Sequence, residues 1–291
     1  MIRIDRGLEP AALAAARTRR LSAAVRAYNQ HGHGSPELAD KLVGYNLQAV
    51  KDALFLAQHK KCAWCEIRAH YSSSPVEHYR PKARAHRHDR GTPPRIDHGH
   101  YWWLTWTWSN LLFSCPRCND QGHKANFFPL APGSSPLSPP SRPHRGRRGP
   151  RFFDISGEQP LLLDPAVDDP LDHIVWKPLQ RALDRRDWKW SPSGLTARGT
   201  ATIAILKLAE VADLVEHHLR VAVLPSLEEI EGHIAAGRSQ ETTKRWQALL
   251  ADTVAASSPF AAATWCALEE WMPAAQRTQF GLSDPVRPTV L

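Results

Sequence analysis

Two stretches of the chain decide its fold: KCAWCEIRAHYSSSPVEHYRPK at residues 61–82 and YWWLTWTWSNLLFSCPRCNDQGHKANFFPL at residues 101–130. Each contains a Cys-x-x-Cys pair, formed by Cys62 with Cys65 and by Cys115 with Cys118. Such a pair makes a tight turn that points two sulfur atoms at one ion, and two pairs complete a tetrahedral zinc site. Four thiolates leave no open coordination position, so we expect a structural zinc.

Composition indicates a globular protein with a polyanionic partner. The chain has 291 residues, of which 42% are hydrophobic and 23% are charged. A chain of this length buries a substantial core in one large domain or two small ones. The formal charge of +8 and the pI of about 9.4 favour nucleic acid as the partner. A basic surface without a ligand is the alternative.

The sequence predicts a cytoplasmic protein without a membrane partner. No apolar run approaches the ~20 residues that span a bilayer, and the N-terminal MIRIDRGLEP lacks the apolar core of a signal peptide. In a reducing cytosol, paired cysteines are more typical of metal ligands than of disulfides. The fifth cysteine, Cys266, lies in the apolar stretch FAAATWCALEEW and is expected to be a small buried hydrophobic residue.

Hydrophobic spacing predicts an α+β chain that is mostly helical. Helices are expected over residues 8–29, 35–59 and 201–224, the last ended by Pro225, with three shorter ones near 226–236, 240–256 and 260–271. Short strands are expected at residues 75–79 and 111–113, and a small β-rich patch near Trp176, Trp188 and Trp190 with a turn at residues 191–194. A further helix is expected to begin near Cys118. The tail from Pro273 is expected to be irregular.

These elements divide the chain into four parts. Residues 1–60 form an N-terminal helical region and residues 61–130 a zinc-binding core. Residues 131–151, rich in Pro, Ser, Gly and Arg, are expected to be a linker or surface loop. Residues 152–291 form a mostly helical C-terminal region.

Residues between and after the two cysteine pairs have the chemistry for phosphodiester hydrolysis. His78 titrates near pH ~6.5 when unperturbed, which suits a general base that activates water. Glu77 and Asn119 offer the oxygen ligands that Mg²⁺ prefers. His123 follows Asn119 by four residues, so both would share one helix face, and His123 is an alternative metal ligand or a phosphate contact. Asn110 has amide donors and an acceptor with which to tie its loop together and orient His78.

These motifs resemble a known family. Glu77-His78, Asn110 and Asn119 are arranged as in the HNH nucleases, with their ββα-metal fold. The match is closer to the retron- and Septu-associated, PtuB-like HNH endonucleases in KCAWCE (61–66), VEHYRPK (76–82), YWWL (101–104), WSNLL (108–112), SCPRCN (114–119) and PLLLDP (160–165). This resemblance implies His78 as general base, Glu77 and Asn119 near a catalytic metal, Asn110 as a structural residue, and a PtuA-type ATPase partner in antiphage defence.

Basic residues around His78 are candidate phosphate contacts, giving salt-sensitive binding that does not depend on sequence. They are Arg80, Lys82, Arg84 and Arg87 in the loop after His78, with Arg117 and Lys124 near the second cysteine pair. The dense tryptophans between residues 101 and 108 could stack on bases, but core packing is the favoured interpretation.

The sequence therefore predicts a metal-dependent endonuclease with a structural Zn²⁺ and a catalytic Mg²⁺ or similar divalent ion. DNA is the favoured substrate over RNA. The alternatives are an RNase effector acting on tRNA-like substrates and a non-catalytic, zinc-stabilised subunit that binds nucleic acid.

Overall fold

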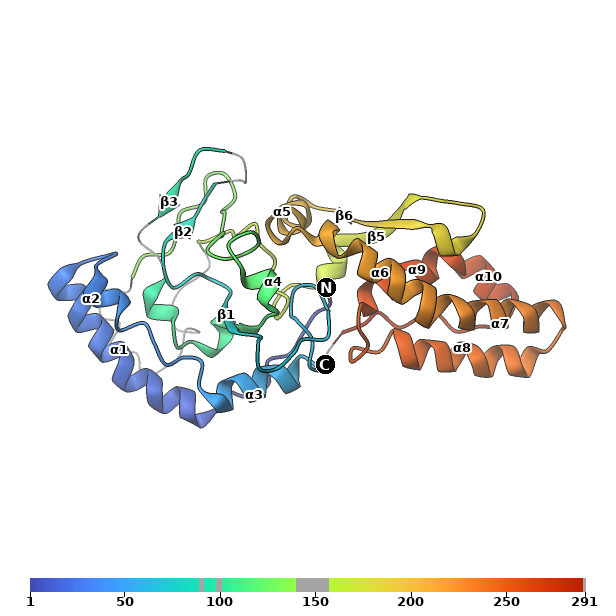
Figure 1. Cartoon of the computed structure of the whole chain (residues 1–291), viewed down its shortest axis with the longest axis horizontal. Coiled ribbons are helices and arrows are strands. Elements are labelled where there is room, and N and C mark those ends of the chain that lie inside the picture. Colours follow the sequence, from blue (N-terminus) through green and yellow to red (C-terminus); the bar gives the residue numbers. More distant parts are fainter. Residues whose placement is uncertain (89–91, 98–100, 140–156, 290–291) are drawn as a thin grey trace.

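The chain folds into two lobes that lie side by side (Figure 1), and the computed structural model describes residues 1–88, 92–97, 101–139 and 157–289. The first lobe contains α1 (Ala11–His31), α2 (Pro36–Ala39), α3 (Gln48–Ala57), α4 (Pro116–Asn119), β1 (Val76–His78), β2 (Ala85–His86), β3 (Ile96–Asp97) and β4 (Leu111–Phe113). The second contains β5 (Ile174–Gln180), β6 (Lys189–Gly194), α5 (Ala197–Leu206), α6 (Ala212–His218), α7 (Leu224–Ala235), α8 (Ser239–Thr253), α9 (Ala261–Trp271) and α10 (Ala274–Gln279). The described part is thus mostly helical with small antiparallel sheets, as predicted.

The N-terminal helices confirm one prediction and correct another. The first helix ends at Gly32, whose positive φ of 79° suits glycine. The predicted helix 35–59 is instead two helices, α2 and α3, separated by residues 40–47. Gly44 in this connection has a φ of 73°, and a Cβ there would lie 2.3 Å from the guanidinium carbon of Arg20. The left-handed φ of Gly44, which an α-helix cannot contain, therefore interrupts a pattern that local spacing makes continuous.

Two strands and a short helix place the cysteine pairs and His78. Strands β1 and β4 pair antiparallel, with His78 opposite Leu111. Helix α4 starts at Pro116, two residues before the predicted start, because Cys115 accepts the cap hydrogen bond from the Cys118 amide at 3.5 Å. It ends at Asn119, so the prediction that Asn119 and His123 share a helix face is wrong.

The tryptophan-rich segment belongs to the core. The segment forms two 3₁₀ turns, η1 (Trp102–Leu104) and η2 (Trp108–Asn110). Trp102, Trp103 and Trp106 are at most 2% exposed. Their packing role, favoured from the sequence, is confirmed.

The second lobe joins a β-hairpin to paired helices. Strands β5 and β6 contain Trp176 and Trp190, and the predicted turn at residues 191–194 is wrong because these residues extend β6. The three shorter helices are confirmed as α7, α8 and α9, whereas the tail contains α10. Pro225 does not end a helix. It occupies the first turn of α7, after a π-helical turn (Leu219–Val223), where a missing N–H is tolerated.

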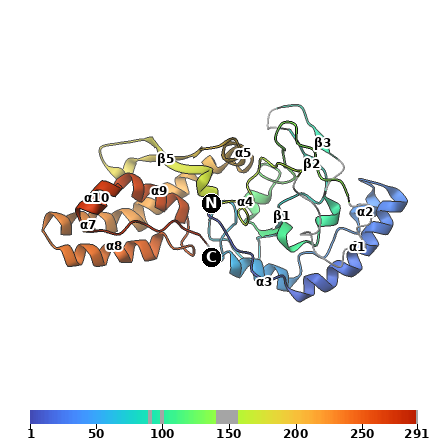
Figure 2. The same cartoon turned by 180° about the vertical axis from the view of Figure 1, so that it is seen from behind.

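Contacts between the lobes are buried and involve both ends of the described chain. The Arg6 guanidinium donates to the Leu111 carbonyl at 2.8 Å and to Asp164 at 2.9 Å. The backbones of Arg3 and Thr289 form an isolated parallel β-bridge. Figure 2 shows the two termini together between the lobes. One hydrophobic core continues through both lobes. Residues 140–151 of the predicted linker lie outside the described residues. No helix among the described residues is long and apolar enough to cross a membrane.

Candidate metal centre and active site

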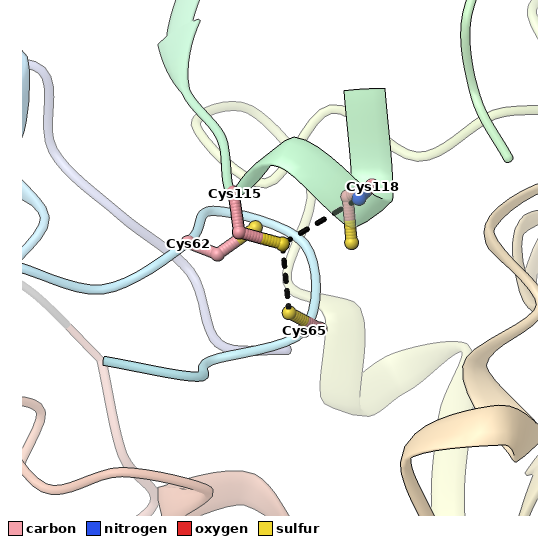
Figure 3. A group of neighbouring side chains, drawn as sticks. All are labelled: Cys62, Cys65, Cys115 and Cys118. Atoms are coloured by element: carbon pink, nitrogen blue, oxygen red, sulfur yellow. Dashed lines mark hydrogen bonds between the residues drawn. The ribbon is translucent and has the colours of Figure 1, made fainter. Parts of the chain in front are cut away.

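The four paired cysteines converge on one buried point (Figure 3). Their sulfur atoms all lie within 4.8 Å of one another, and the Cys65 and Cys115 sulfurs are 3.7 Å apart. A tetrahedron with Zn–S bonds of ~2.3 Å has edges of about 3.8 Å, so the donor set fits zinc. Cys266 lies apart in α9, where burial raises the pKa of its thiol to about 11. The predicted grouping of four cysteines and the isolation of the fifth are both confirmed.

Hydrogen bonds connect the first cysteine pair to the strands. The Gln58 side chain donates to the Phe113 carbonyl and accepts from the Phe113 amide, both at 2.8 Å. Ala63 donates its amide to the same carbonyl at 3.1 Å. Lys61 is buried, with its ammonium 3.1 Å from Glu66 and donating to Ser258 of the second lobe at 2.7 Å. The metal centre is therefore fixed to β4 and to the second lobe.

His78 lies at the end of β1 with its imidazole oriented by a backbone carbonyl. Its Nε2 is 2.9 Å from the Thr105 oxygen. Because a carbonyl oxygen only accepts hydrogen bonds, the proton resides on Nε2 and the lone pair on Nδ1. Within the described residues Nδ1 forms no hydrogen bond. Burial lowers the pKa of His78 to about 3, and the charges of Lys82 and Lys124 act in the same direction. The ring is therefore neutral at physiological pH.

Asn110 closes the loop that follows His78. Its side-chain oxygen accepts from the Arg80 amide at 2.8 Å, and its amide nitrogen donates to the Arg80 carbonyl at 3.0 Å. Its own carbonyl accepts from the Tyr79 amide at 2.9 Å. This is the contact expected of a structural asparagine, and its effect on activity stays a prediction.

Glu77 is paired with a lysine. The Lys124 ammonium lies 2.5 Å from the Glu77 carboxylate and 2.6 Å from the His78 carbonyl oxygen. Burial raises the pKa of Glu77, and the Lys124 charge opposes that rise. Lys124 is fully buried, so it cannot reach the phosphate contact predicted from the sequence.

His123 and Asn119 are placed differently from one another. His123 lies between two carboxylates, 2.7 Å from Asp120 through Nδ1 and 3.0 Å from Glu210 through Nε2. Asn119 is half-buried, and its side-chain amide forms no hydrogen bond within the described residues. Apart from the cysteines, the described His, Asp and Glu residues form no group of three that could hold a metal. Glu77 and His123 are thus not gathered around one ion.

A short segment between α2 and α3 covers His78. The Tyr45 ring meets the imidazole edge-on, with centroids 4.3 Å apart. Lys82 donates to the Leu42 carbonyl at 3.0 Å, and Trp106 donates to the Val43 carbonyl at 3.0 Å. This covering segment, residues 42–45, leaves His78 only 5% exposed. No local pattern in the sequence predicts this segment or the role of Thr105, because both contacts with His78 are tertiary.

The predicted phosphate contacts differ in their availability. Arg80 is paired with Glu158 at 2.7 Å, Arg87 with Asp97 at 2.9 Å and Arg117 with Glu210 at 3.1 Å. Arg84 is exposed, with no ion pair in the described part of the chain. Of the predicted set, Arg84 has the side chain that is most accessible to a ligand.

Similarity to a known protein was found for part of the chain. This chain is 34% identical to "Septu protein PtuB" of Bacillus mycoides (strain KBAB4) over 135 residues. These residues are 46% of this chain and 40% of that relative, so the match spans about two-fifths of the relative's length. No family model and no solved structure matches the chain. The similarity supports a Septu PtuB-like protein, whereas HNH membership stays a prediction.

Proposed function

We propose that this chain is an HNH endonuclease that hydrolyses nucleic-acid phosphodiester bonds as the nuclease of an antiphage defence system. The single observation that carries the proposal is the orientation of His78. Its Nε2 donates to the Thr105 carbonyl, so Nδ1 is left as the basic nitrogen of a neutral imidazole. A fixed tautomer of this kind is what a general base for water requires.

Three other features support the same reaction. Antiparallel strands β1 and β4 followed by α4 give the strand, strand and helix order of a ββα nuclease core. Asn110 fixes the backbone immediately after His78. The thiolate cluster holds α4 against the same strands, so a bound zinc would keep the site in register.

In the proposed mechanism, His78 Nδ1 accepts a proton from water as the water attacks phosphorus. A base whose pKa is about 3 holds that proton weakly, so negative charge from bound substrate is needed to strengthen it. Asn119 is the accessible oxygen donor for a divalent metal such as Mg²⁺, which would supply positive charge at the leaving oxygen. The covering segment must move before a phosphate reaches Nδ1.

The similarity to a Septu protein also supports a partner. We propose a PtuA-type ATPase whose binding, or nucleotide state, shifts the covering segment away from His78. DNA is the proposed substrate, and structured RNA is the alternative.

A non-catalytic nucleic-acid-binding subunit is the second candidate. It is favoured by the cover over His78 and by the pairing of Glu77 with Lys124. Such a protein would need the zinc centre and the basic residues but no base.

The two functions are separated by assays on the chain purified with the ATPase from the same genome. Supercoiled plasmid, single-stranded DNA and tRNA are incubated with Mg²⁺ or with chelator, using wild type and His78→Ala. We expect metal-dependent cleavage of DNA that His78→Ala lowers by about 1,000-fold, with binding retained. Binding without cleavage of any substrate by wild type would exclude the nuclease, and cleavage of tRNA alone would identify an RNase.

A further inference from the structure

We propose that Lys124 is a positioning residue that holds His78 and Glu77 in place, and that Glu77 serves as its counter-ion and not as a metal ligand. The inference rests on the proposed function for its catalytic consequence. It is carried by a different observation, which is the environment of one buried ammonium group.

The Lys124 ammonium is surrounded by oxygen acceptors in the protein interior. It is 2.5 Å from Glu77 Oε1, 2.6 Å from the His78 carbonyl and 3.3 Å from the Ala125 carbonyl. An ammonium group has three donors, so these contacts use all of them. The side chain is 0% exposed, which leaves no surface from which it could bind a substrate phosphate.

This geometry fixes the catalytic strand at its end. The His78 carbonyl cannot rotate without breaking a charge-assisted hydrogen bond inside the core. The Thr105 carbonyl fixes the ring of the same residue from another segment. Backbone and side chain of His78 are therefore held independently, and the orientation of Nδ1 depends on both.

Lys124 also connects His78 to the zinc centre. Its backbone amide donates to the carbonyl of Cys118 at 3.2 Å, and its carbonyl accepts from Phe127 at 2.7 Å. The turn that begins at the second cysteine pair thus determines where the ammonium lies. Disturbing the metal centre would move His78 through this connection.

The same contacts bear on Glu77. A buried carboxylate that is already paired with an ammonium at 2.5 Å is electrostatically compensated. A divalent ion at the same oxygen would have to compete with Lys124. The sequence suggested Glu77 as a metal ligand, and its described surroundings favour the counter-ion role instead.

The experiment compares Lys124→Met with Lys244→Met, an exposed lysine of α8, in the complex with the ATPase. Zinc content, the ¹⁵N shifts of the His78 ring, and the kcat and KM for plasmid cleavage are measured. We expect Lys124→Met to retain zinc, to alter the His78 ring signals and to lower kcat by about 100-fold with little change in KM. Ring signals and kcat equal to those of Lys244→Met would overturn the proposal.

Glu77→Gln decides the outcome if Lys124→Met does not fold. As a counter-ion, Glu77 should affect kcat while the Mg²⁺ concentration for half-maximal cleavage stays unchanged. A tenfold or larger rise in that concentration, with kcat restored at saturating Mg²⁺ (about 1.4 kcal/mol of metal binding), would identify a metal ligand. If wild type does not cleave at all, the nuclease proposal fails, and the ring signals of Lys124→Met or of Glu77→Gln still decide the positioning role.

Discussion

The two lobes differ in charge and in what holds them together. Residues 1–139 contain 19 Lys and Arg against 10 Asp and Glu, whereas residues 174–291, from β5 onward, contain 13 of each. The net basic character of the chain therefore lies in the lobe with His78 and the cysteines, and in the stretch that follows it. A polyanion is attracted to the first lobe, whereas the second lobe has no net charge that would attract it, so the second lobe is better suited to contact protein than nucleic acid.

The polar contacts of the lobes differ in the same way. Lys61–Glu66 and Lys124–Glu77 in the first lobe, and Arg6–Asp164 between the lobes, are buried ion pairs. Removing one partner of such a pair typically costs about 3–5 kcal/mol. In the second lobe, pairs such as Arg186–Glu228 are exposed and contribute little. The first lobe thus contains buried ion pairs and the four-cysteine cluster, while the ion pairs of the second lobe are mostly exposed, Arg277 with Glu269 and Asp284 being an exception.

Removing zinc tests whether the first lobe needs the metal to fold and the second does not. Of the predictions, this one has the largest expected effect. Cys115→Ser, or chelation, should abolish zinc binding and unfold the first lobe, because structural zinc supplies about 10 kcal/mol or more of folding free energy. The near-ultraviolet circular dichroism contributed by the buried tryptophans of the first lobe should be lost, so the total signal should fall, while the tryptophan signal of the second lobe and the helical signal from α5 to α10 persist. Metal analysis and limited proteolysis complete the measurement.

Cys266→Ala is the control, since Cys266 lies in α9 away from the cluster. It should keep one zinc per chain. A Cys115→Ser protein with an unchanged near-ultraviolet spectrum would show that the first lobe does not need the metal.

The pH dependence of stability should identify His78 as a buried neutral base. Its folded pKa, about 3, is below the ordinary value of 6.5, so the unfolded chain binds more protons between these values. The contribution of the neutral ring to the free energy of unfolding is present above pH 6.5. It decreases as the pH falls, by about 2 kcal/mol at pH 5. Urea unfolding of wild type and His78→Gln across this range, with zinc present, measures the difference. Parallel curves for the two proteins would contradict the burial of a neutral imidazole.

The parts of the site that the sequence predicted are those set by local spacing. Two Cys-x-x-Cys pairs, the strand ending at His78 and the loop-closing Asn110 are all recognisable without a structure. The break within residues 35–59 is not predicted, because a single glycine inside a helical pattern does not by itself reveal the left-handed φ that Gly44 adopts. Lys124 was assigned to the surface because lysine is rarely fully buried, and only the fold places Glu77 against it.

His123 illustrates the same limit from the opposite direction. The four-residue spacing predicts that His123 and Asn119 share one helix face, but α4 ends at Asn119. One partner of His123 is its neighbour Asp120, and the other is Glu210, which follows 87 residues later. Spacing patterns carry no information on a contact of that sequence separation.

Charge reversal at one exposed arginine in each lobe tests whether nucleic acid binds only the first lobe. Of the predictions, this one has the smallest expected effect. Arg84 is exposed in the basic first lobe, and Arg238 is exposed in the second lobe, before α8. Arg84→Glu should weaken DNA binding by roughly tenfold or less and reduce the slope of log K against log salt by about 1, because one phosphate contact is lost. Arg238→Glu should change neither quantity. Fluorescence anisotropy with labelled duplex DNA at several salt concentrations measures both. Equal losses for the two variants would mean that nucleic acid contacts both lobes, and that the second lobe is not reserved for a protein partner.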